Sequence, residues 1–251
     1  MTAANRDANG PRYARVDHRS ELPTVLHALA VQCGRPVLVL VGGASGVAPE
    51  HLHAMAVLMR ERVVPRLDRW GAAVVNGGTD AGVMRAIGQA HSAAGANFPL
   101  IGVAAAGTVS IPDAEEPTAD AVELEPNHTH VVLVPGDSWG DESPWVSHVA
   151  TAVAGGHPSA TLVVNGGEIT YEDVAQSLTA GRPVIVVAGT GRTADAIAAA
   201  AAGQGYDVRA AQLAASPSVR VVPLNDPDAV TSAMEAVLSP GGSAAATSAW
   251  L

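Results

Sequence analysis

The 251-residue sequence contains no lysine and only one cysteine, Cys33. Without lysine the protein can use neither Schiff-base chemistry nor the lysine-dependent phosphate loop of Walker-type nucleotide-binding proteins. A single cysteine forms no disulfide within the chain, and no cysteine pair is present to anchor a zinc site. We therefore expect no disulfide and no metal site, a pattern that fits a reducing cytoplasm.

Basic residues and long apolar runs are also scarce. Fourteen basic residues stand against 24 acidic ones, and the resulting net charge of -10 opposes binding to the phosphate backbone of nucleic acids. No apolar run reaches the roughly 20 residues that span a bilayer, and residues 1–19 lack the apolar core of a signal peptide. These absences predict a cytoplasmic protein that binds neither nucleic acid nor membrane.

What remains is typical of an α/β domain. Hydrophobic residues make up 48% of the chain but aromatic residues only 3%, so Val, Ala, Leu and Ile must build the core. Seven apolar runs predict buried strands: Val37–Val41, Ala72–Val75, Leu100–Ala104, Val131–Val134, Leu162–Val164, Val184–Val187 and Val219–Val222. Stretches with helical spacing precede, separate and follow them: Glu21–Val31, His51–Leu67, Val83–Ala94, Trp145–Ala154, Tyr171–Leu178, Ala194–Ala202 and Asp228–Leu238.

Strands that alternate with helices indicate parallel pairing, because a parallel connection needs a crossover long enough to hold a helix. The sequence therefore predicts a single Rossmann-like, doubly wound α/β domain with a mainly parallel sheet of about seven strands and helices on both faces. We expect this domain over residues 21–238, a flexible leader over 1–20 and a flexible tail over 239–251. The acidic stretch 109–126 is expected to be a surface excursion.

Four of the predicted strands end in glycine-rich turns. The pentapeptide VVNGG occurs at residues 74–78 and again at 163–167, and related turns lie at 41–46 and 188–195. The carboxyl ends of parallel strands meet at one edge of the sheet, so these turns should converge there. Glycine lets backbone N–H groups approach a ligand, and a helix that begins directly afterwards attracts an anion. The alternative is that the glycines only reverse the chain and bind nothing.

Several side chains near these turns could assist a ligand. Arg192, and after it Arg85, is the strongest candidate for a phosphate contact. Thr79 and Thr170 could cap a helix or bond a phosphate oxygen. Four acids either favour the adjacent helix starts or contact a sugar: Asp80, Glu168, Glu172 and Asp173.

Two further features leave alternatives open. His128 and His130 lie two residues apart at a strand start, and either bind a metal or shape the turn there. Trp139 and Trp145 flank the acidic segment GDES, and either pack locally, stack on a base or contact a second subunit.

Four spaced motifs carry a family resemblance: GGTDAGVM at residues 77–84, EPNHTHVVLV at 125–134, VVNGGEIT at 163–170 and VAGTGRTADAIA at 187–198. Together they resemble the prokaryotic form of the SLOG domain found at the N-terminus of melastatin-type TRP channels, over residues 35 to about 202. The resemblance implies binding or sensing of an NAD- or ADP-ribose-like nucleotide, no required cofactor, and a homo-oligomer, a dimer or tetramer.

The predicted ligand-binding residues all lie in or beside these motifs and turns. They are Gly42, Gly43, Ala44, Asn76, Gly77, Gly78, Thr79, Gly82, Val83, Met84, Asn127, His128, Asn165, Gly166, Gly167, Glu168, Thr170, Gly189, Thr190, Gly191 and Arg192.

The second VVNGG segment is also similar, more distantly, to the PGGxGTxxE motif of the Lonely Guy phosphoribohydrolases. Gly166, Gly167 and Thr170 match that motif, whereas Ile169 replaces its third glycine and Asp173 its catalytic glutamate. No arginine or lysine lies between residues 110 and 165 to supply the arginine of those enzymes. The sequence therefore favours binding over catalysis. An N-glycosidic nucleotide hydrolase, with Glu168, Glu172 or Asp173 as its carboxyl group, is the alternative.

Overall fold

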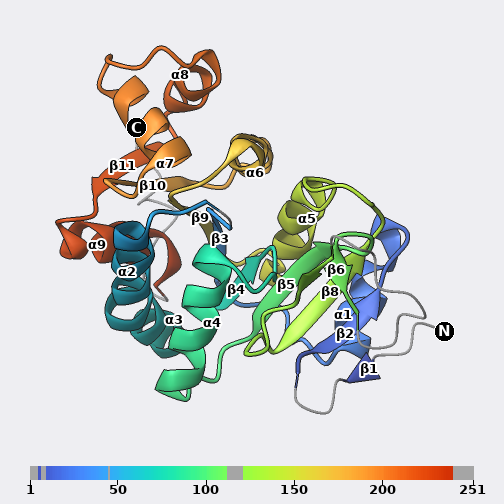
Figure 1. The fold of residues 1–251 in the computed structure, drawn as a ribbon. Coiled ribbons are helices and arrows are strands. Elements are labelled where there is room, and N and C mark those ends of the chain that lie inside the picture. Colours follow the sequence, from blue (N-terminus) through green and yellow to red (C-terminus); the bar gives the residue numbers. More distant parts are fainter. Residues whose placement is uncertain (1–4, 7–9, 45, 112–120, 240–251) are drawn as a thin grey trace.

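The computed structural model, which describes residues 5–6, 10–44, 46–111 and 121–239, confirms the predicted α/β fold (Figure 1). Nine strands form the central sheet in the order β1-β2-β8-β5-β4-β3-β9-β10-β11. All neighbours pair in parallel except β1, which is antiparallel to β2. The strands are β1 Asn5–Arg6, β2 Arg12–Arg15, β3 Val37–Gly42, β4 Ala73–Asn76, β5 Leu100–Ala105, β8 His130–Val134, β9 Ser159–Val164, β10 Val184–Ala188 and β11 Val219–Pro223. Two short strands, β6 Val109–Ser110 and β7 Val122–Glu123, pair separately.

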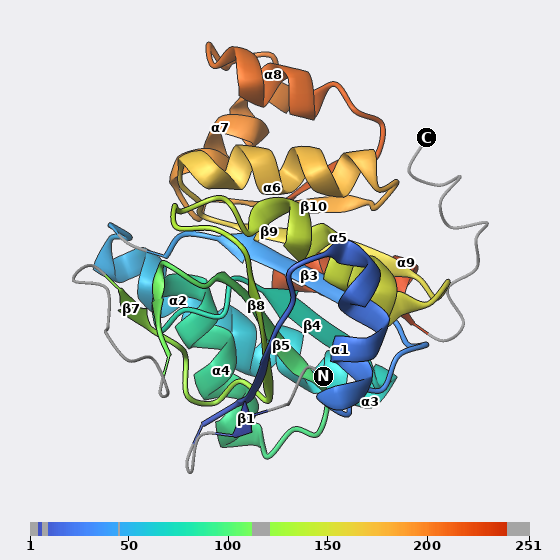
Figure 2. The same cartoon turned by 90° about the vertical axis from the view of Figure 1, so that its right-hand side faces the viewer.

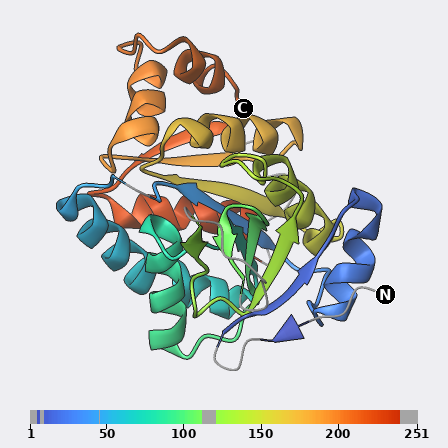
Figure 3. The same ribbon diagram turned by 45° about the vertical axis from the view of Figure 1, so that its right-hand side comes forward.

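Helices cover both faces of the sheet. One face carries α1 Leu22–Ala28, α5 Ser143–Ala154, α6 Glu168–Thr179, α7 Arg192–Ala201 and α8 Val208–Ala214. The other carries α2 Pro49–Leu58, the π-helical turn η2 Met59–Val63, α3 Val64–Trp70, α4 Gly82–Ala94 and α9 Pro227–Leu238. Figures 1 and 3 show α2, α3 and α4 side by side on one face, and Figure 2 shows α7 and α8 stacked beyond α6.

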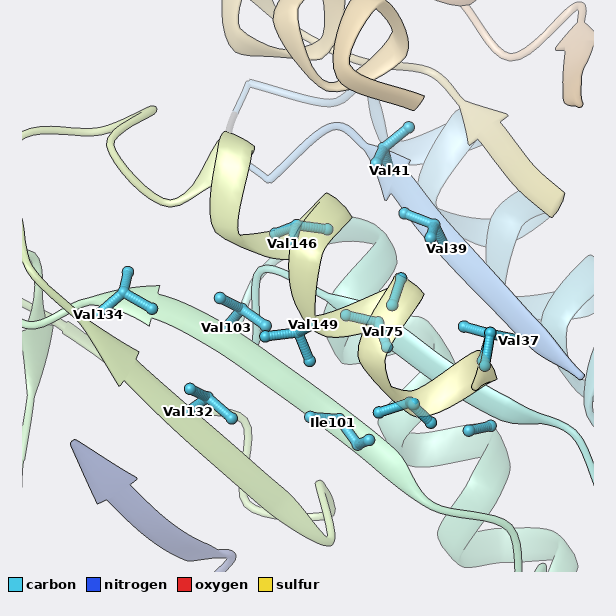
Figure 4. Close-up of a cluster of buried hydrophobic side chains, with 14 of the residues drawn as sticks. Val37, Val39, Val41, Val75, Ile101, Val103, Val132, Val134, Val146 and Val149 are labelled. Atoms are coloured by element: carbon cyan, nitrogen blue, oxygen red, sulfur yellow. The ribbon is translucent and has the colours of Figure 1, made fainter. Parts of the chain in front are cut away.

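Strand β3 shows how the apolar runs build two cores. Successive side chains of a strand point to opposite faces, so Val37, Val39 and Val41 pack beneath α5 and α6, while Leu38 and Leu40 pack against the helices of the other face. Figure 4 shows the first of these cores, in which Val146 and Val149 of α5 lie over valines of four strands. Burial on both faces explains why the sequence runs are continuous rather than alternating.

All seven predicted strands and all seven predicted helical stretches contain the expected elements, and three differences have clear causes. The prediction of a flexible leader is wrong for residues 12–15, which form β2 and pair with β8. Only Tyr13 and Ala14 of β2 are buried, between two arginines, so no apolar run marks it. Helix α8 was not predicted. It begins at the N-cap Asp207, whose carboxylate accepts hydrogen bonds from the N–H groups of residues 209 and 210.

The stretch predicted as one helix over 51–67 contains the π-turn η2. Pro65 has no N–H to donate to the carbonyl four residues earlier, and the N–H of Val64 bonds instead to the carbonyl of Met59, five residues back. The predicted surface excursion at 109–126 also has buried parts, Val109 and Glu125, while residues 112–120 and the predicted tail beyond residue 239 lie outside the described residues.

No helix within the described ranges is long and apolar enough to cross a membrane.

The strand order fixes where a ligand can bind. From β3 the chain proceeds to β4, β5 and β8 on one side and then returns to β9 on the other. Ligands of open α/β sheets bind at such a switch point, outside the carboxyl ends of the strands. The relevant crevice in this protein therefore lies where β3 and β9 end.

Candidate functional site

A cavity of about 240 Å³ lies at this switch point. All four glycine-rich turns contribute to its wall, so the predicted convergence of the turns is what the structure shows. Its lining residues are Leu40, Val41, Gly42, Ala44, Gly77, Thr79, Met84, Ala104, Thr108, Trp139, Glu142, Val146, Gly167, Glu168, Ile169, Thr170, Asp173 and Arg192.

Gly42 and Gly77, which both line the cavity, differ in what a side chain would meet there. At Gly42 a Cβ atom would lie 2.0 Å from the carbonyl oxygen of Val164, so only glycine lets β3 and β9 approach each other at their ends. At Gly77 a Cβ atom would meet no atom within 4 Å, and the φ angle lies outside the left-handed region. An added methyl group at Gly77 would therefore extend into open space at the cavity rather than into the protein.

Two helix N-termini and one guanidinium group give the cavity its positive side. Residues 168–170, which open α6, all line the cavity, and so does Arg192, the first residue of α7. The Arg192 side chain lies beside Gly167, whose Cβ position would be 3.0 Å from one guanidinium nitrogen. Arg192 is the one cationic residue among the described lining residues. Unpaired N–H groups at helix starts and a guanidinium are the groups that bind phosphate.

The backbone at these turns adopts conformations that side chains rarely take. Asn165 and Arg192 have φ angles of 63° and 54°, in the left-handed region. The Asn165 N–H donates to the Thr190 hydroxyl at 2.7 Å, and its side-chain amide donates to the Thr190 carbonyl. These bonds hold the ends of β9 and β10 together. Strained backbone of this kind costs about 1–3 kcal/mol per residue and is typically found at functional sites.

The cavity wall also contains carboxyl groups, among them Glu142 and Asp173. Asp173 is partly buried in the wall, and burial, with smaller effects from Glu142 and Glu172, raises its pKa to about 7, although the nearby Ser143 hydroxyl lowers it. Burial also raises the pKa of Glu142, against the effect of its hydrogen bond from the Gly140 N–H. A carboxyl group that titrates near neutral pH can donate or accept a proton under physiological conditions.

Two residues at the rim complete the cavity. The side chain of Trp139 is 48% exposed although it lines the cavity, so its ring is available to a ligand. Glu168 is bound by Arg209 of α8 in an ion pair of 2.6 Å, and this contact lowers the Glu168 pKa. The Arg209 guanidinium also lies 4.1 Å from the centre of the Tyr171 ring.

Nine of the 21 predicted ligand-binding residues line the cavity: Gly42, Ala44, Gly77, Thr79, Met84, Gly167, Glu168, Thr170 and Arg192. The other twelve do not: Gly43, Asn76, Gly78, Gly82, Val83, Asn127, His128, Asn165, Gly166, Gly189, Thr190 and Gly191. Most of these twelve lie directly behind the lining residues and support the turns.

Four other predicted candidates do not line the cavity: Asp80, Arg85, His130 and Glu172. Glu172 is exposed and accepts a hydrogen bond from Gln176. Of the three acids considered for catalysis, only Glu168 and Asp173 line the cavity. Arg85 is bound by Asp80 at 2.7 Å. His128 contacts Glu125 and Asn76, whereas His130 contacts Thr129. Within the described residues no three His, Cys, Asp or Glu side chains are grouped to hold a metal ion.

Sequence reasoning missed several lining residues. Leu40, Val41, Ala104 and Val146 are core residues of strands and a helix, and only the fold brings their ends to the cavity. Glu142 belongs to the GDES segment, whose acidity was the available signal. Trp139, for which base stacking was one alternative, does lie at the cavity.

Two known channel proteins are similar in sequence to part of this chain. The chain is 27% identical over 180 residues to the rat transient receptor potential cation channel subfamily M member 2, an alignment that covers 58% of this chain and 12% of the channel. It is 24% identical over 224 residues to the mouse protein of the same name, covering 74% of this chain and 15% of the channel. The chain thus spans less than a sixth of either relative.

The family described as "SLOG in TRPM, prokaryote" matches residues 35–232, which include all four glycine-rich turns, every lining residue of the cavity and the strands from β3 to β11. The match covers well over half of the chain, and the protein belongs to this SLOG family.

Proposed function

We propose that the cavity binds a nucleotide-derived small molecule of the NAD or ADP-ribose class, and that the protein is a ligand-binding or sensing domain. The observation that carries this proposal is the convergence of four glycine-rich turns and Arg192 around one cavity at the switch point of the sheet. The family membership supports the same ligand class through the SLOG resemblance.

The phosphate of the ligand would lie on the positive side of the cavity. Gly77 places no side chain between the backbone and the ligand, and the start of α6 adds N–H groups. The Arg192 guanidinium lies beside Gly167, at the same side, and supplies a full charge. The protein has a net charge of -10, so this local arrangement, rather than the overall charge, must attract an anion.

The sugar and base would lie toward the carboxyl groups of the wall. Glu142 and Asp173 can accept hydrogen bonds from ribose hydroxyls, and a protonated Asp173 can also donate one. The exposed Trp139 ring offers a surface on which a base can stack. Groups that bind phosphate, together with carboxyl groups and an exposed aromatic ring, fit a nucleotide better than either a simple anion or an apolar ligand.

Calorimetry with AMP, ADP-ribose and NAD tests the proposal. We expect saturable binding by the wild-type protein and a loss of about tenfold or more in affinity for Arg192→Gln, because a charge-assisted bond contributes about 1.5–3 kcal/mol. Arg69→Gln is the matched control, since Arg69 is exposed at the end of α3, at the opposite edge of the sheet. No binding of any of the three nucleotides at millimolar concentration would refute the proposal.

The position of Asp173 favours a second candidate, hydrolysis of an N-glycosidic bond. Asp173 lines the cavity, and a carboxyl group with a pKa near 7 can protonate a departing purine base; water then adds to the anomeric carbon and its proton returns to the Asp173 carboxylate. Release of free base from AMP or NAD, abolished by Asp173→Asn but not by Glu172→Gln, would establish an enzyme. Binding without release of base would leave the sensing function.

A further inference from the structure

We propose that Glu125, His128 and Asn76 form a buried positioning network that holds the Gly77–Thr79 turn in its ligand-binding shape. This inference rests on the proposed function, because it assigns a role to residues behind a turn that is proposed to contact the ligand. It gives the EPNHTH segment a function other than ligand contact, since neither Asn127 nor His128 lines the cavity.

The network is a continuous chain of hydrogen bonds. The N–H of Gly78 donates to Asn76 Oδ1 at 2.8 Å, and His128 Nε2 lies 2.9 Å from the same oxygen. At the other side of the ring, His128 Nδ1 lies 2.7 Å from Glu125 Oε2. One amide oxygen therefore connects the backbone of the turn to an imidazole and, through it, to a carboxylate.

The hydrogen-bond count fixes the direction of these bonds. A backbone N–H can only donate, so the atom facing Gly78 must be the oxygen of Asn76, and His128 Nε2 must then carry a hydrogen. Glu125 accepts two further bonds from Asn127, one from its N–H at 3.0 Å and one from its side-chain amide at 2.6 Å.

Backbone bonds attach the same turn to the same segment. The N–H of Glu125 donates to the carbonyl of Gly78 at 2.9 Å, and the N–H of Asp80 donates to the carbonyl of Glu123 at 2.8 Å. Thr79 forms a bridge with Leu124 between these two bonds. The turn therefore has two sides: Gly77 and Thr79 reach the cavity, and Asn76 and Gly78 are held from behind.

The surroundings are adapted to this network. Asn76, Glu125 and His128 are at most 3% exposed. A Cβ at Gly88 of α4 would lie 2.1 Å from Glu125 Oε2, so the helix has a glycine where the carboxylate packs. The Asn76 side-chain nitrogen is buried with no hydrogen-bond partner within the described part of the chain, which is destabilising. The oxygen of the same Asn76 amide bonds to the Gly78 N–H and to His128, and these two bonds explain why asparagine occupies this position.

His91 provides a matched control for His128. Both are buried histidines, but His91 bonds to the carbonyl of Phe98 at 2.9 Å and packs edge-on against the Phe98 ring, and neither contact involves Asn76 or the turn. His128→Leu and His91→Leu therefore each remove a buried imidazole, and only the first removes a group bonded to Asn76. His128→Gln tests rescue, because its amide can still donate a hydrogen bond toward Asn76 Oδ1.

The experiment compares amide hydrogen exchange of Gly78 and Asp80, measured by NMR, with calorimetric affinity for AMP and ADP-ribose. For His128→Leu we expect exchange at both amides to rise about tenfold beyond any change in global stability, and affinity to fall about tenfold. His91→Leu should leave both quantities within about threefold of wild type after the same correction, and His128→Gln should recover part of both losses.

The inference is overturned if His128→Leu retains wild-type exchange at Gly78 and Asp80, or if His91→Leu changes these amides as much. It is also overturned if exchange rises while the affinity of a nucleotide that binds the wild type is unchanged. If the wild type binds neither nucleotide, the proposed function fails on its own, and the exchange data still decide whether the network holds the turn.

Discussion

Asp173→Asn should stabilise the protein at neutral and alkaline pH. The carboxyl group of Asp173 lies in the cavity wall, where burial raises its pKa from a usual value of 3.8 to about 7. Asparagine has nearly the same shape and can still form a hydrogen bond, but it carries no charge to bury. The substitution therefore removes an electrostatic cost and little else.

The size of the stability change follows from the size of the Asp173 pKa shift. Three pKa units correspond to about 4 kcal/mol at about 1.36 kcal/mol each, and access of solvent through the cavity reduces this to about 3 kcal/mol. Below the unfolded-state pKa both states are protonated, so no cost exists near pH 3.5. Between there and pH 7 the unfolded state ionises while the folded state keeps its proton, so stability falls as pH rises. The full cost is present above pH 7.

Urea unfolding at 25 °C, followed by far-ultraviolet circular dichroism at pH 4.5, 6 and 8, measures this. The free energy of unfolding of Asp173→Asn should exceed that of wild type by about 1 kcal/mol at pH 4.5 and by about 3 kcal/mol at pH 8. Glu172→Gln, on the same helix but exposed, is the control and should change stability by less than about 0.5 kcal/mol. A difference at pH 8 no larger than at pH 4.5 would refute the reasoning.

Three more substitutions test other parts of the structure. Gly77→Ala should weaken ADP-ribose binding, measured by calorimetry, about tenfold, because the added methyl group extends into the cavity. The melting temperature should not change, since the methyl group meets no protein atom, and a lower melting temperature would contradict this. Arg182→Ala should lower the free energy of unfolding in urea by about 3 kcal/mol or more, because the buried guanidinium donates hydrogen bonds to Ser147, Thr151 and Ser159. A decrease no larger than that caused by Arg69→Ala, at an exposed arginine, would contradict this prediction. Asp226→Ala should cost about 1 kcal/mol in the same assay by removing the N-cap of α9, and Asp226→Ser should recover most of it.

The fold was predictable where burial on both faces left a continuous apolar run, as in β3 and β10. Strand β2 left no such signal, because only Tyr13 and Ala14 are buried and its place in the sheet comes from backbone pairing with β8. The π-turn of η2 follows from Pro65, yet proline more often ends a helix than widens it. Sequence thus predicts burial well and the energetics of backbone pairing poorly.

The site was predictable only in its backbone part. Parallel topology brings the glycine turns to one edge, and this follows from strand order alone. The partnership of Asn76 with His128 joins residues 52 positions apart, and no local spacing reveals it. A histidine next to a predicted site resembles a ligand contact in the sequence, whether it faces the cavity or lies behind the turn. Only the tertiary structure distinguishes these two positions.

Glycine turns create the need for such buried support. A turn that presents bare backbone to a ligand has no side chain of its own with which to pack, so its shape must be held from the opposite side. Asn165 and Thr190 do this for the second VVNGG turn, as Asn76 and His128 do for the first. The polar side chains in such motifs are therefore expected behind the turn, and the residues that contact the ligand are expected to be the glycines and the helix starts that follow them.

Energetic costs of three kinds occur at this edge of the sheet. Asp173 titrates near neutral pH because it is buried, Asn165 and Arg192 have left-handed backbone, and the Asn76 amide nitrogen is buried without a described partner. Costs of the same kinds occur at the opposite edge, where burial lowers the pKa of His130 to about 4 and Arg35 Nε is buried with no hydrogen-bond partner within the described residues. A sequence optimised only for stability would have removed such costs, as Asp173→Asn is expected to do. Such costs therefore do not single out the cavity, and the case for binding at this edge rests on the convergence of the glycine-rich turns and Arg192 there.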